Sequence, residues 1–170
     1  MTKNIHSGID QKVINMKKFK EFLTGKGYIS LSVTDDDCKK IFDILDGLNI
    51  KDYIKDLHLT LMYDKSNPKI DVDSQKKSYI AKINSFKTLG EPDSKWYAIA
   101  LDLESPELNE RHNELKKLGF AHSYPNFIAH ISMKYKPTES DITILKDNLE
   151  LFKKLGNIHL HNETMKRIEE

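Results

Sequence analysis

The chain contains one short phrase twice, and this repeat constrains its fold more than any other feature. The copies are Leu57–Tyr63, with the sequence LHLTLMY, and Ala129–Tyr135, with the sequence AHISMKY. In each copy, a histidine inside an apolar run is followed two positions later by a small hydroxyl residue. Because alternate residues of a strand share a face, each phrase predicts a β-strand that buries apolar side chains and presents an imidazole and a hydroxyl on its other side.

This shared face carries the side chains needed to cleave a phosphodiester next to a ribose 2′-hydroxyl. The alternation assigns to it His58, Thr60 and Met62 in the first strand and His130, Ser132 and Lys134 in the second. Histidine, with a reference pKa of about 6.5, acts as base or acid near neutral pH. Hydroxyl donors held at the phosphate oxygens stabilise the charge that gathers there in the transition state. Two such strands facing one cleft predict a reaction that needs no metal and no other cofactor.

Length and charge narrow the class of partner. The chain has 170 residues, which suits one domain or two intimately packed half-domains. Together with the paired motif, it predicts a single domain over 1–170 whose two half-lobes share a cleft, with residues 1–15 as a polar extension. Its 27 basic and 26 acidic residues give a net charge of +1, which argues against a long nucleic acid as partner. A small, compact anionic substrate remains compatible with this balance.

The remaining composition favours a soluble cytosolic protein without a membrane partner. Cys38 is the single cysteine, so no internal disulfide can form. The first residues are polar and lack the apolar segment of a signal peptide. No apolar run approaches the roughly 20 residues of a membrane span.

Periodicity and turn residues predict the order strand, helix, strand, occurring twice. The expected elements are a helix over 11–24, a strand over 28–33, a helix over 35–48, the first motif strand, strands over 78–89 and 96–103, a helix over 106–118, the second motif strand, a helix over 138–155 and a strand over 158–168. A motif strand therefore closes each half, which indicates an internal duplication of the architecture.

Two His-x-Thr/Ser phrases on strands, each preceded by a helix, resemble the signature of the 2H phosphoesterase superfamily. The resemblance extends from about Gly27 to Ile168. It implies an α+β fold with two pseudo-symmetric lobes, in which antiparallel sheets form a central cleft and the helices lie outside.

Longer phrases are similar to the phage anti-CBASS cyclic-oligonucleotide phosphodiesterases. They are Lys26–Leu31, Leu57–Asp64 and Phe120–Pro125, the last leading to the second motif. The resemblance implies metal-independent cleavage of 3′–5′ bonds in a 3′,3′-cyclic di- or trinucleotide, in the host cytoplasm. The catalytic residues that it implies are His58, Thr60, His130 and Ser132.

Four further residues are candidates for substrate binding. The resemblance implies an early tyrosine and a late acidic residue, for which Tyr28 and Glu163 are the candidates. Tyr28 and Trp96 can stack on bases, although Trp96 can equally serve in core or rim packing. Lys134 can neutralise a phosphate, but an exposed lysine is commonly only solvated.

Two other functions stay open. One is a 2H enzyme that processes RNA ends, acting on 2′,3′-cyclic phosphates or 2′,5′ linkages, although the near-neutral charge disfavours a large RNA. The other is a module that sequesters cyclic nucleotides without cutting them, a task that would not require two proton-transfer groups. The sequence does not assign base and acid between the two histidines.

Overall fold

The protein has the expected α+β fold, as described by a computed structural model of residues 25–73 and 76–169. Within these residues the strands are β1 (Tyr28–Val33), β2 (His58–Tyr63), β3 (Tyr79–Leu89), β4 (Ala98–Glu104), β5 (His130–Tyr135) and β6 (Ile158–Lys166), and the helices are α2 (Asp35–Gly47), α3 (Pro106–Leu118), α4 (Glu139–Asp147) and α5 (Leu149–Lys153). The helix predicted over 11–24 and the extension predicted over 1–15 lie outside the described residues.

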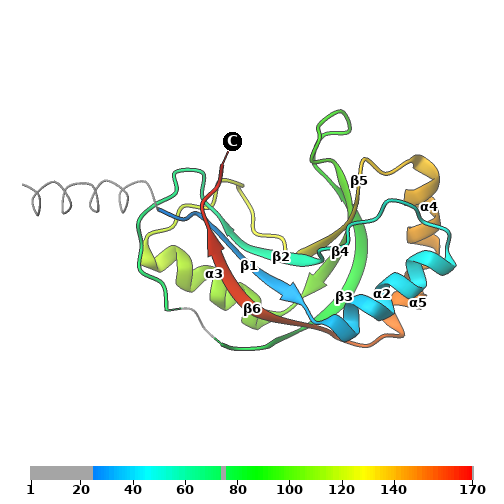
Figure 1. Cartoon of the computed structure of the whole chain (residues 1–170), viewed down its shortest axis with the longest axis horizontal. Helices are drawn as coiled ribbons and strands as arrows, with labels where there is room; N and C mark the ends of the chain where they lie inside the picture. The colour runs from blue at the N-terminus through cyan, green and yellow to red at the C-terminus, as the bar shows by residue number, and fades with distance from the viewer. Residues whose placement is uncertain (1–24, 74–75, 170) are drawn as a thin grey trace, which may run out of the picture.

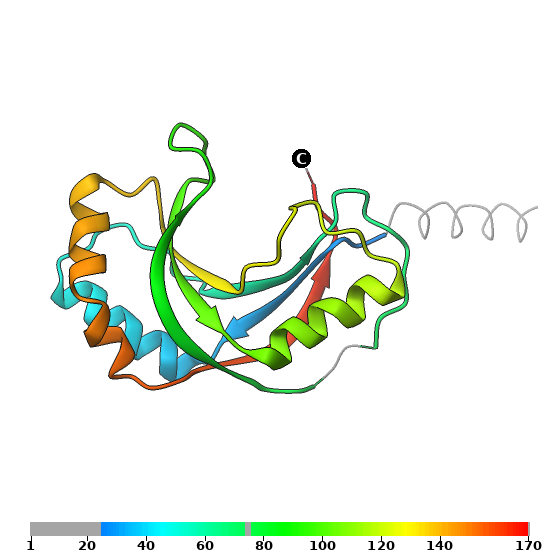
Figure 2. The same ribbon diagram turned by 180° about the vertical axis from the view of Figure 1, so that it is seen from behind.

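The strands form one antiparallel sheet in the order β2-β1-β6-β3-β4-β5. It divides into a lobe of β2, β1 and β6 and a lobe of β3, β4 and β5, and Figures 1 and 2 show its strong curvature. The long strand β3 joins the lobes, because its residues Tyr79–Ala81 pair with β6 and its residues Lys82–Leu89 pair with β4. Each motif strand is thus an edge strand of its lobe.

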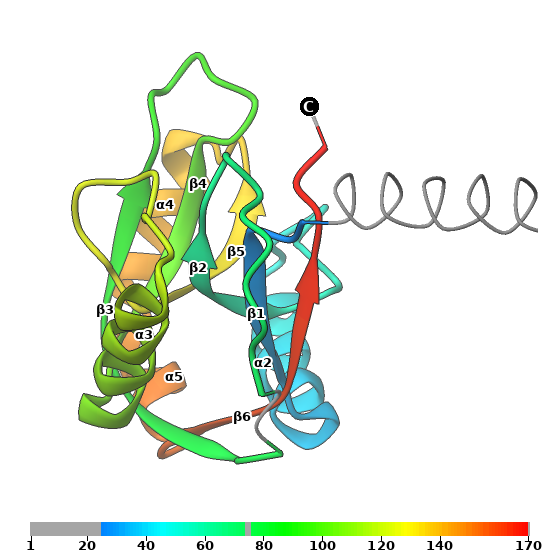
Figure 3. The ribbon, with the colours of Figure 1, turned by 90° about the vertical axis from the view of Figure 1, so that its left-hand side faces the viewer.

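Curvature brings the two edge strands together, as seen in Figure 3. The segment before β2 is bound to the end of β5, because Ile54 N–H donates to the Met133 carbonyl at 2.7 Å. The segment before β5 is bound to the end of β2, because Ser123 N–H donates to the Tyr63 carbonyl at 2.8 Å. The start of each motif strand therefore lies beside the end of the other, as an approximate twofold relation between the lobes requires.

The core lies on the faces of the strands that turn away from the motif side chains. Its strand residues with 0% exposure include Ile29, Leu31, Leu59, Leu61, Ile99, Leu101, Ile131 and Met133. Helix α3 packs against β2, and helices α4 and α5 pack against β3 (Figures 1 and 2). The amphipathic helices thus cover the apolar side of the sheet. No helix among the described residues is long and apolar enough to cross a membrane.

Helices α3 and α4 begin at the capping residues that the local sequence provides, whereas the last predicted helix is divided in two. Ser105 accepts the Leu108 N–H at 3.4 Å and precedes Pro106 at the start of α3. Thr138 opens α4 with a reciprocal capping box. The single helix predicted over 138–155 is divided at Asn148, whose backbone leaves the helical conformation between α4 and α5.

A β-bulge in β2 changes the predicted alternation. β1 pairs Ser30 with Thr60 and Ile29 with Met62, so Leu61 is an extra residue. Both Leu61 and Met62 are fully buried in the core. The prediction that Met62 shares the motif face is therefore wrong, because one unpaired residue moves every later side chain to the opposite face.

The second motif strand contains the equivalent bulge. β4 pairs Ala100 with Ser132 and Ile99 with Lys134, so Met133 is the extra residue. Because Ile99 belongs to the core face, Lys134 is directed away from the motif face, contrary to the prediction. The two copies of the motif thus share their backbone irregularity as well as their residue types.

Candidate active site

Each motif histidine is held by the backbone two residues before it. The Nδ1 atom of His58 lies 2.9 Å from the Asp56 carbonyl oxygen, and the Nδ1 atom of His130 lies 2.7 Å from that of Ile128. A carbonyl oxygen only accepts hydrogen bonds, so each neutral imidazole carries its proton on Nδ1. The Nε2 lone pair of each ring is then available to take a proton from a substrate.

The two motif histidines come from different lobes but lie on strands that contact each other. Burial is the main cause that lowers the pKa of His130 from 6.5, and the nearby His58 lowers it further. The hydrogen bond to Ile128 and the Asp102 carboxylate act in the opposite direction. This influence requires the rings to be close, and it matches the contact between β2 and β5. The structure therefore brings the predicted pair of titratable groups together.

The motif hydroxyls share the face of the histidines. Thr60 Oγ1 donates to the phenolic oxygen of Tyr28 at 3.2 Å. The Tyr28 ring meets the His58 ring edge-on, with 6.3 Å between centroids. Burial raises the pKa of Tyr28, against the bond from Thr60, so its phenol stays protonated. Tyr28 and Thr60 thus surround His58, and Ser132 occupies the Thr60 position of the second copy.

The residues paired with the histidines differ between the lobes. Ser32 on β1 lies opposite His58, whereas Asp102 on β4 lies opposite His130. The buried Asp102 carboxylate accepts a 2.9 Å hydrogen bond from the Asn84 amide. Asp102 was not identified from the sequence, although an acid between Leu101 and Leu103 in an otherwise apolar run is a usable signal.

The bulges place a tyrosine at the end of the motif face in each copy. Tyr63 lies opposite Tyr28 in the pairing of β1 with β2, and Tyr135 lies opposite Ala98 in the pairing of β4 with β5. The Tyr63 and Tyr28 rings meet edge-on at 5.8 Å. An uninterrupted alternation from the histidines would instead put both tyrosines on the opposite, apolar face.

Trp96 lies at the rim of the molecule. Strand β4 begins at Ala98, so Trp96 belongs to the preceding loop, and 63% of it is exposed, which excludes core packing. Its ring lies edge-on to Tyr135, with 5.8 Å between centroids. Trp96, a candidate for base stacking, thus lies beside the last residue of β5.

Lys134 is not positioned to neutralise a phosphate at the motif face. Its Nζ atom lies 2.8 Å from Asp141 Oδ2 in the first turn of α4, and both side chains are little exposed. The bulge at Met133 causes this placement by directing Lys134 toward the helix side. Lys134 therefore lies outside the candidate site.

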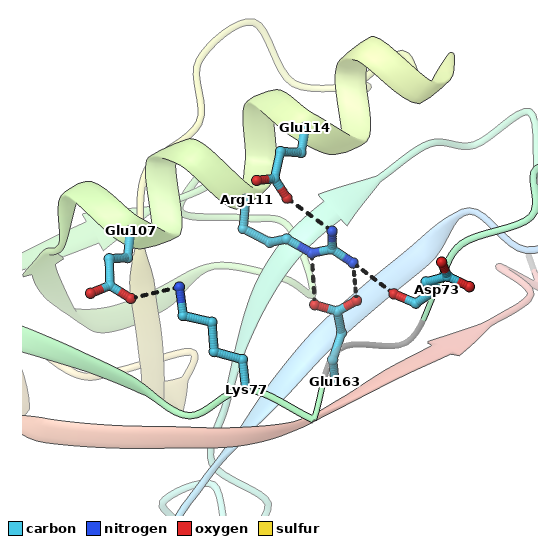
Figure 4. A network of polar contacts seen from close by, with 6 residues as sticks. All are labelled: Asp73, Lys77, Glu107, Arg111, Glu114 and Glu163. Carbon is cyan, nitrogen blue, oxygen red and sulfur yellow. Dashed lines mark hydrogen bonds and ion pairs between the residues drawn. The ribbon is translucent and has the colours of Figure 1, made fainter.

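Glu163 also lies away from the motif face, contrary to the substrate-binding role that the resemblance implied. Its carboxylate is fully buried and accepts from Arg111 Nε at 2.9 Å and Arg111 Nη2 at 2.6 Å (Figure 4). On β6 the residues paired with the motif-face serines of β1 are His161 and Thr164, while Glu163 points toward α3. The Glu163 carboxylate therefore forms an ion pair inside the protein.

A segment before the second motif is fastened to the end of the first. Tyr63 N–H donates to His122 Nδ1 at 3.1 Å, and Ser123 N–H donates to the Tyr63 carbonyl. Ala121 N–H donates to the buried Asp64 carboxylate at 2.8 Å. These bonds join the two halves of the chain beside the motif histidines.

His122 makes this junction sensitive to pH. Burial, followed by the neighbouring His112 and Lys116, lowers the pKa of His122 from 6.5 to about 4. Between pH 6.5 and pH 4 the unfolded chain therefore protonates His122 more readily than the folded protein does. The free energy of unfolding falls across this range by up to about 3 kcal/mol.

His122→Asn keeps an acceptor for Tyr63 but cannot titrate. We expect urea unfolding to show a smaller decline for this variant, and equal declines would contradict the assignment.

An acidic pocket of about 670 Å³ lies beside the site, between α2 and the segment before β2. Its wall includes Ser32 and Asp56, which flank His58, together with Asp35, Asp43 and Asp46. Among residues 25–73 and 76–169, no group of three or more His, Cys, Asp or Glu side chains is arranged to hold a metal ion.

The chain is similar in sequence to a protein family and a curated relative, and in fold to a solved structure. The sequence model of the family "Anti-CBASS protein Acb1" matches residues 26–170. Anti-CBASS protein Acb1 of Vibrio phage KVP40 is 25% identical over 121 residues, which cover 69% of this chain and 78% of the relative. The structure of Kluyveromyces marxianus Usb1 overlaps 85% of this chain and 99% of its own, with a TM-score of 0.48 and 12% identity. The family match spans both motif strands and all the described elements, and the chain therefore belongs to the anti-CBASS protein Acb1 family.

Proposed function

We propose that this protein is a phosphodiesterase that cleaves 3′–5′ bonds of cyclic di- and trinucleotides without a metal. Membership of the anti-CBASS family supports a role against CBASS signalling inside an infected bacterial cell. The observation that carries the proposal is the pair of backbone-held imidazoles on β2 and β5, two strands that contact each other across the lobes.

The chemistry begins with in-line attack of a ribose 2′-oxygen on the adjacent phosphorus. One imidazole Nε2 takes the 2′-proton, and the other imidazolium gives a proton to the departing 5′-oxygen. The bond from phosphorus to the 5′-oxygen breaks as the bond to the 2′-oxygen forms, which opens the ring and leaves a 2′,3′-cyclic phosphate. Water can then open that phosphate with the roles of the two imidazoles exchanged.

The lowered pKa of His130 supports the role of base for this residue. Burial and the proximity of His58 lower its pKa, so it is neutral at pH 7 and its Nε2 can accept a proton. His58 is then the acid of the first step. When substrate binds, the Thr60 hydroxyl would turn its proton from Tyr28 to a non-bridging phosphate oxygen, and the Ser132 hydroxyl would donate to another, where charge develops. Of the two candidates for base stacking, Trp96, which is 63% exposed, is the one proposed to stack on a base, whereas Tyr28 is held between Thr60 and His58.

A substrate panel in EDTA tests the proposal. The protein is incubated with a 3′,3′-cyclic dinucleotide, a cyclic trinucleotide and an RNA with a 2′,3′-cyclic end, and the products are separated by chromatography. Linear products from the cyclic nucleotides in the presence of EDTA are expected. Cleavage confined to the RNA end would instead indicate RNA processing, binding without cleavage would indicate sequestration, and activity lost in EDTA would contradict metal independence.

The pH dependence of kcat/KM follows from the two roles. His130 must be neutral to act as base, and because its pKa is lowered, the acid limb of the profile should lie below pH 6.5. The rate should fall again at higher pH as the acid loses its proton, which gives a bell. Initial rates between about pH 5 and 9 would measure both limbs. A rate that rises throughout this range would contradict the presence of an acid partner.

A further inference from the structure

We infer that Tyr124, supported by Tyr63, forms a stacking surface for one nucleobase of the substrate, at the end of the site opposite Trp96. This inference rests on the proposed function. The two rings lie 5.6 Å apart at an angle of 36°, and Tyr124 is 54% exposed. An exposed tyrosine ring beside a phosphodiester site offers the flat apolar face on which any base can stack.

The position of Tyr124 is fixed by its neighbours rather than left to a free loop. Hydrogen bonds attach both preceding residues to the end of β2: His122 accepts from Tyr63 N–H, and the Ser123 hydroxyl accepts from Lys65 N–H at 3.0 Å. The His122 ring also meets the Tyr124 ring edge-on, with 5.8 Å between centroids. A ring held in this way loses little conformational freedom when a base binds, which favours affinity.

Aromatic contacts connect this surface to the catalytic face. Tyr124 packs on Tyr63, Tyr63 meets Tyr28 at 5.8 Å, and Tyr28 meets His58 at 6.3 Å. Each spacing lies in the range in which aromatic rings attract one another. The surface is therefore continuous with the place where the phosphate would bind.

The twofold relation between the lobes supplies the second argument. Tyr63 and Tyr135 occupy equivalent positions after equivalent bulges, and each contacts an exposed aromatic residue, Tyr124 or Trp96. Because the motif strands run antiparallel, the two aromatic pairs lie at opposite ends of the strand pair. A cyclic dinucleotide has two bases on opposite sides of its phosphate ring, and the two pairs match this arrangement.

The test measures binding separately from cleavage. The ligand is a 3′,3′-cyclic dinucleotide with 2′-deoxyriboses, which lacks the attacking hydroxyl and therefore survives the proposed reaction. Isothermal titration calorimetry should give a Kd for Tyr124→Ala that is roughly 5- to 150-fold higher than that of the unaltered protein, which is the usual effect of losing one base stack. Tyr124→Phe, which keeps the ring, should bind within about threefold of the unaltered protein. Leu151→Ala, which changes an exposed apolar residue on α5, is the matched control and should bind normally.

Kinetics with the ribonucleotide substrate provide the second readout. Tyr124→Ala should raise KM while kcat changes little, because the ring lies beyond the reacting atoms. Equal Kd values for Tyr124→Ala and the unaltered protein would overturn the inference and leave the proposed function standing. If the unaltered protein binds the deoxy ligand through Tyr124 but does not cut the ribonucleotide, the proposed function fails and the stacking surface stands. A protein that does not bind the deoxy ligand overturns the inference.

Discussion

Replacing either His58 or His130 with alanine is expected to lower kcat for a cyclic dinucleotide by about 10²- to 10⁴-fold, the usual contribution of a positioned acid or base. Both groups act in the same step, since one removes the 2′-proton while the other protonates the leaving oxygen. The double variant should therefore be little worse than the poorer single variant. Single-turnover assays with each purified variant measure these losses.

Loss of folding must be separated from loss of chemistry in these variants. Each motif histidine makes one hydrogen bond to a backbone carbonyl, so its removal should cost only about 1 kcal/mol of stability. His159→Ala is a matched control, because this exposed strand histidine lies on β6 outside the site. Substantial activity in either the His58 or the His130 variant would contradict the paired role.

Replacing Glu163 with alanine is expected to destabilise the protein by about 3–5 kcal/mol, because it leaves the Arg111 charge buried without its main partner. The Glu163 side chain has 0% exposure and that of Arg111 has 6%. The bidentate hydrogen bond to Glu163 raises the pKa of Arg111 in the unaltered protein. An arginine also stays protonated without such a partner, so the variant would retain a buried positive charge. Urea unfolding would show the loss as a lower midpoint.

The same arginine provides the control for this experiment. Arg111 Nη1 also donates to Glu114 at 3.0 Å, but the Glu114 side chain is 54% exposed (Figure 4). Glu114→Ala should change the stability by less than about 1 kcal/mol, because solvent screens an exposed pair. Equal stability of the Glu163 and Glu114 variants would contradict the structural role of Glu163. An increase in KM without any loss of stability would restore Glu163 as a substrate-binding residue.

Local signals predicted the parts of the fold that depend on neighbours in sequence. Strands β2 and β5 were read from the alternation around His58 and His130, and α3 from Ser105 and Pro106, whose capping bond involves a residue three positions away. Such interactions form within one turn or one strand, so the sequence contains all the information that they need.

The bulges could not be predicted in the same way. The phrase LHLTLMY allows either Met62 or Tyr63 to share a face with Thr60, and only the pairing with β1 decides between them. The same choice between Lys134 and Tyr135 is made by the pairing with β4. Register is a property of two strands, so an extra residue in one strand is visible only when its partner is known.

Long-range partners explain the remaining differences. Glu163 is separated from Arg111 by 52 positions, and no local pattern around either residue predicts their ion pair. Tyr124 becomes part of the site because the segment before β5 is attached to the end of β2. The histidines themselves were predicted to meet because the repeated motif implied a twofold arrangement of the lobes, and this arrangement was found.

The most direct measurement is a crystal structure of the protein bound to the 2′-deoxy cyclic dinucleotide. We expect one phosphate between the two motif rings, with the Nε2 atoms of His58 and His130 on opposite sides of it and the hydroxyls of Thr60 and Ser132 at its non-bridging oxygens. A ligand that touches only one of the two histidines, or that lies elsewhere on the molecule, would contradict this expectation.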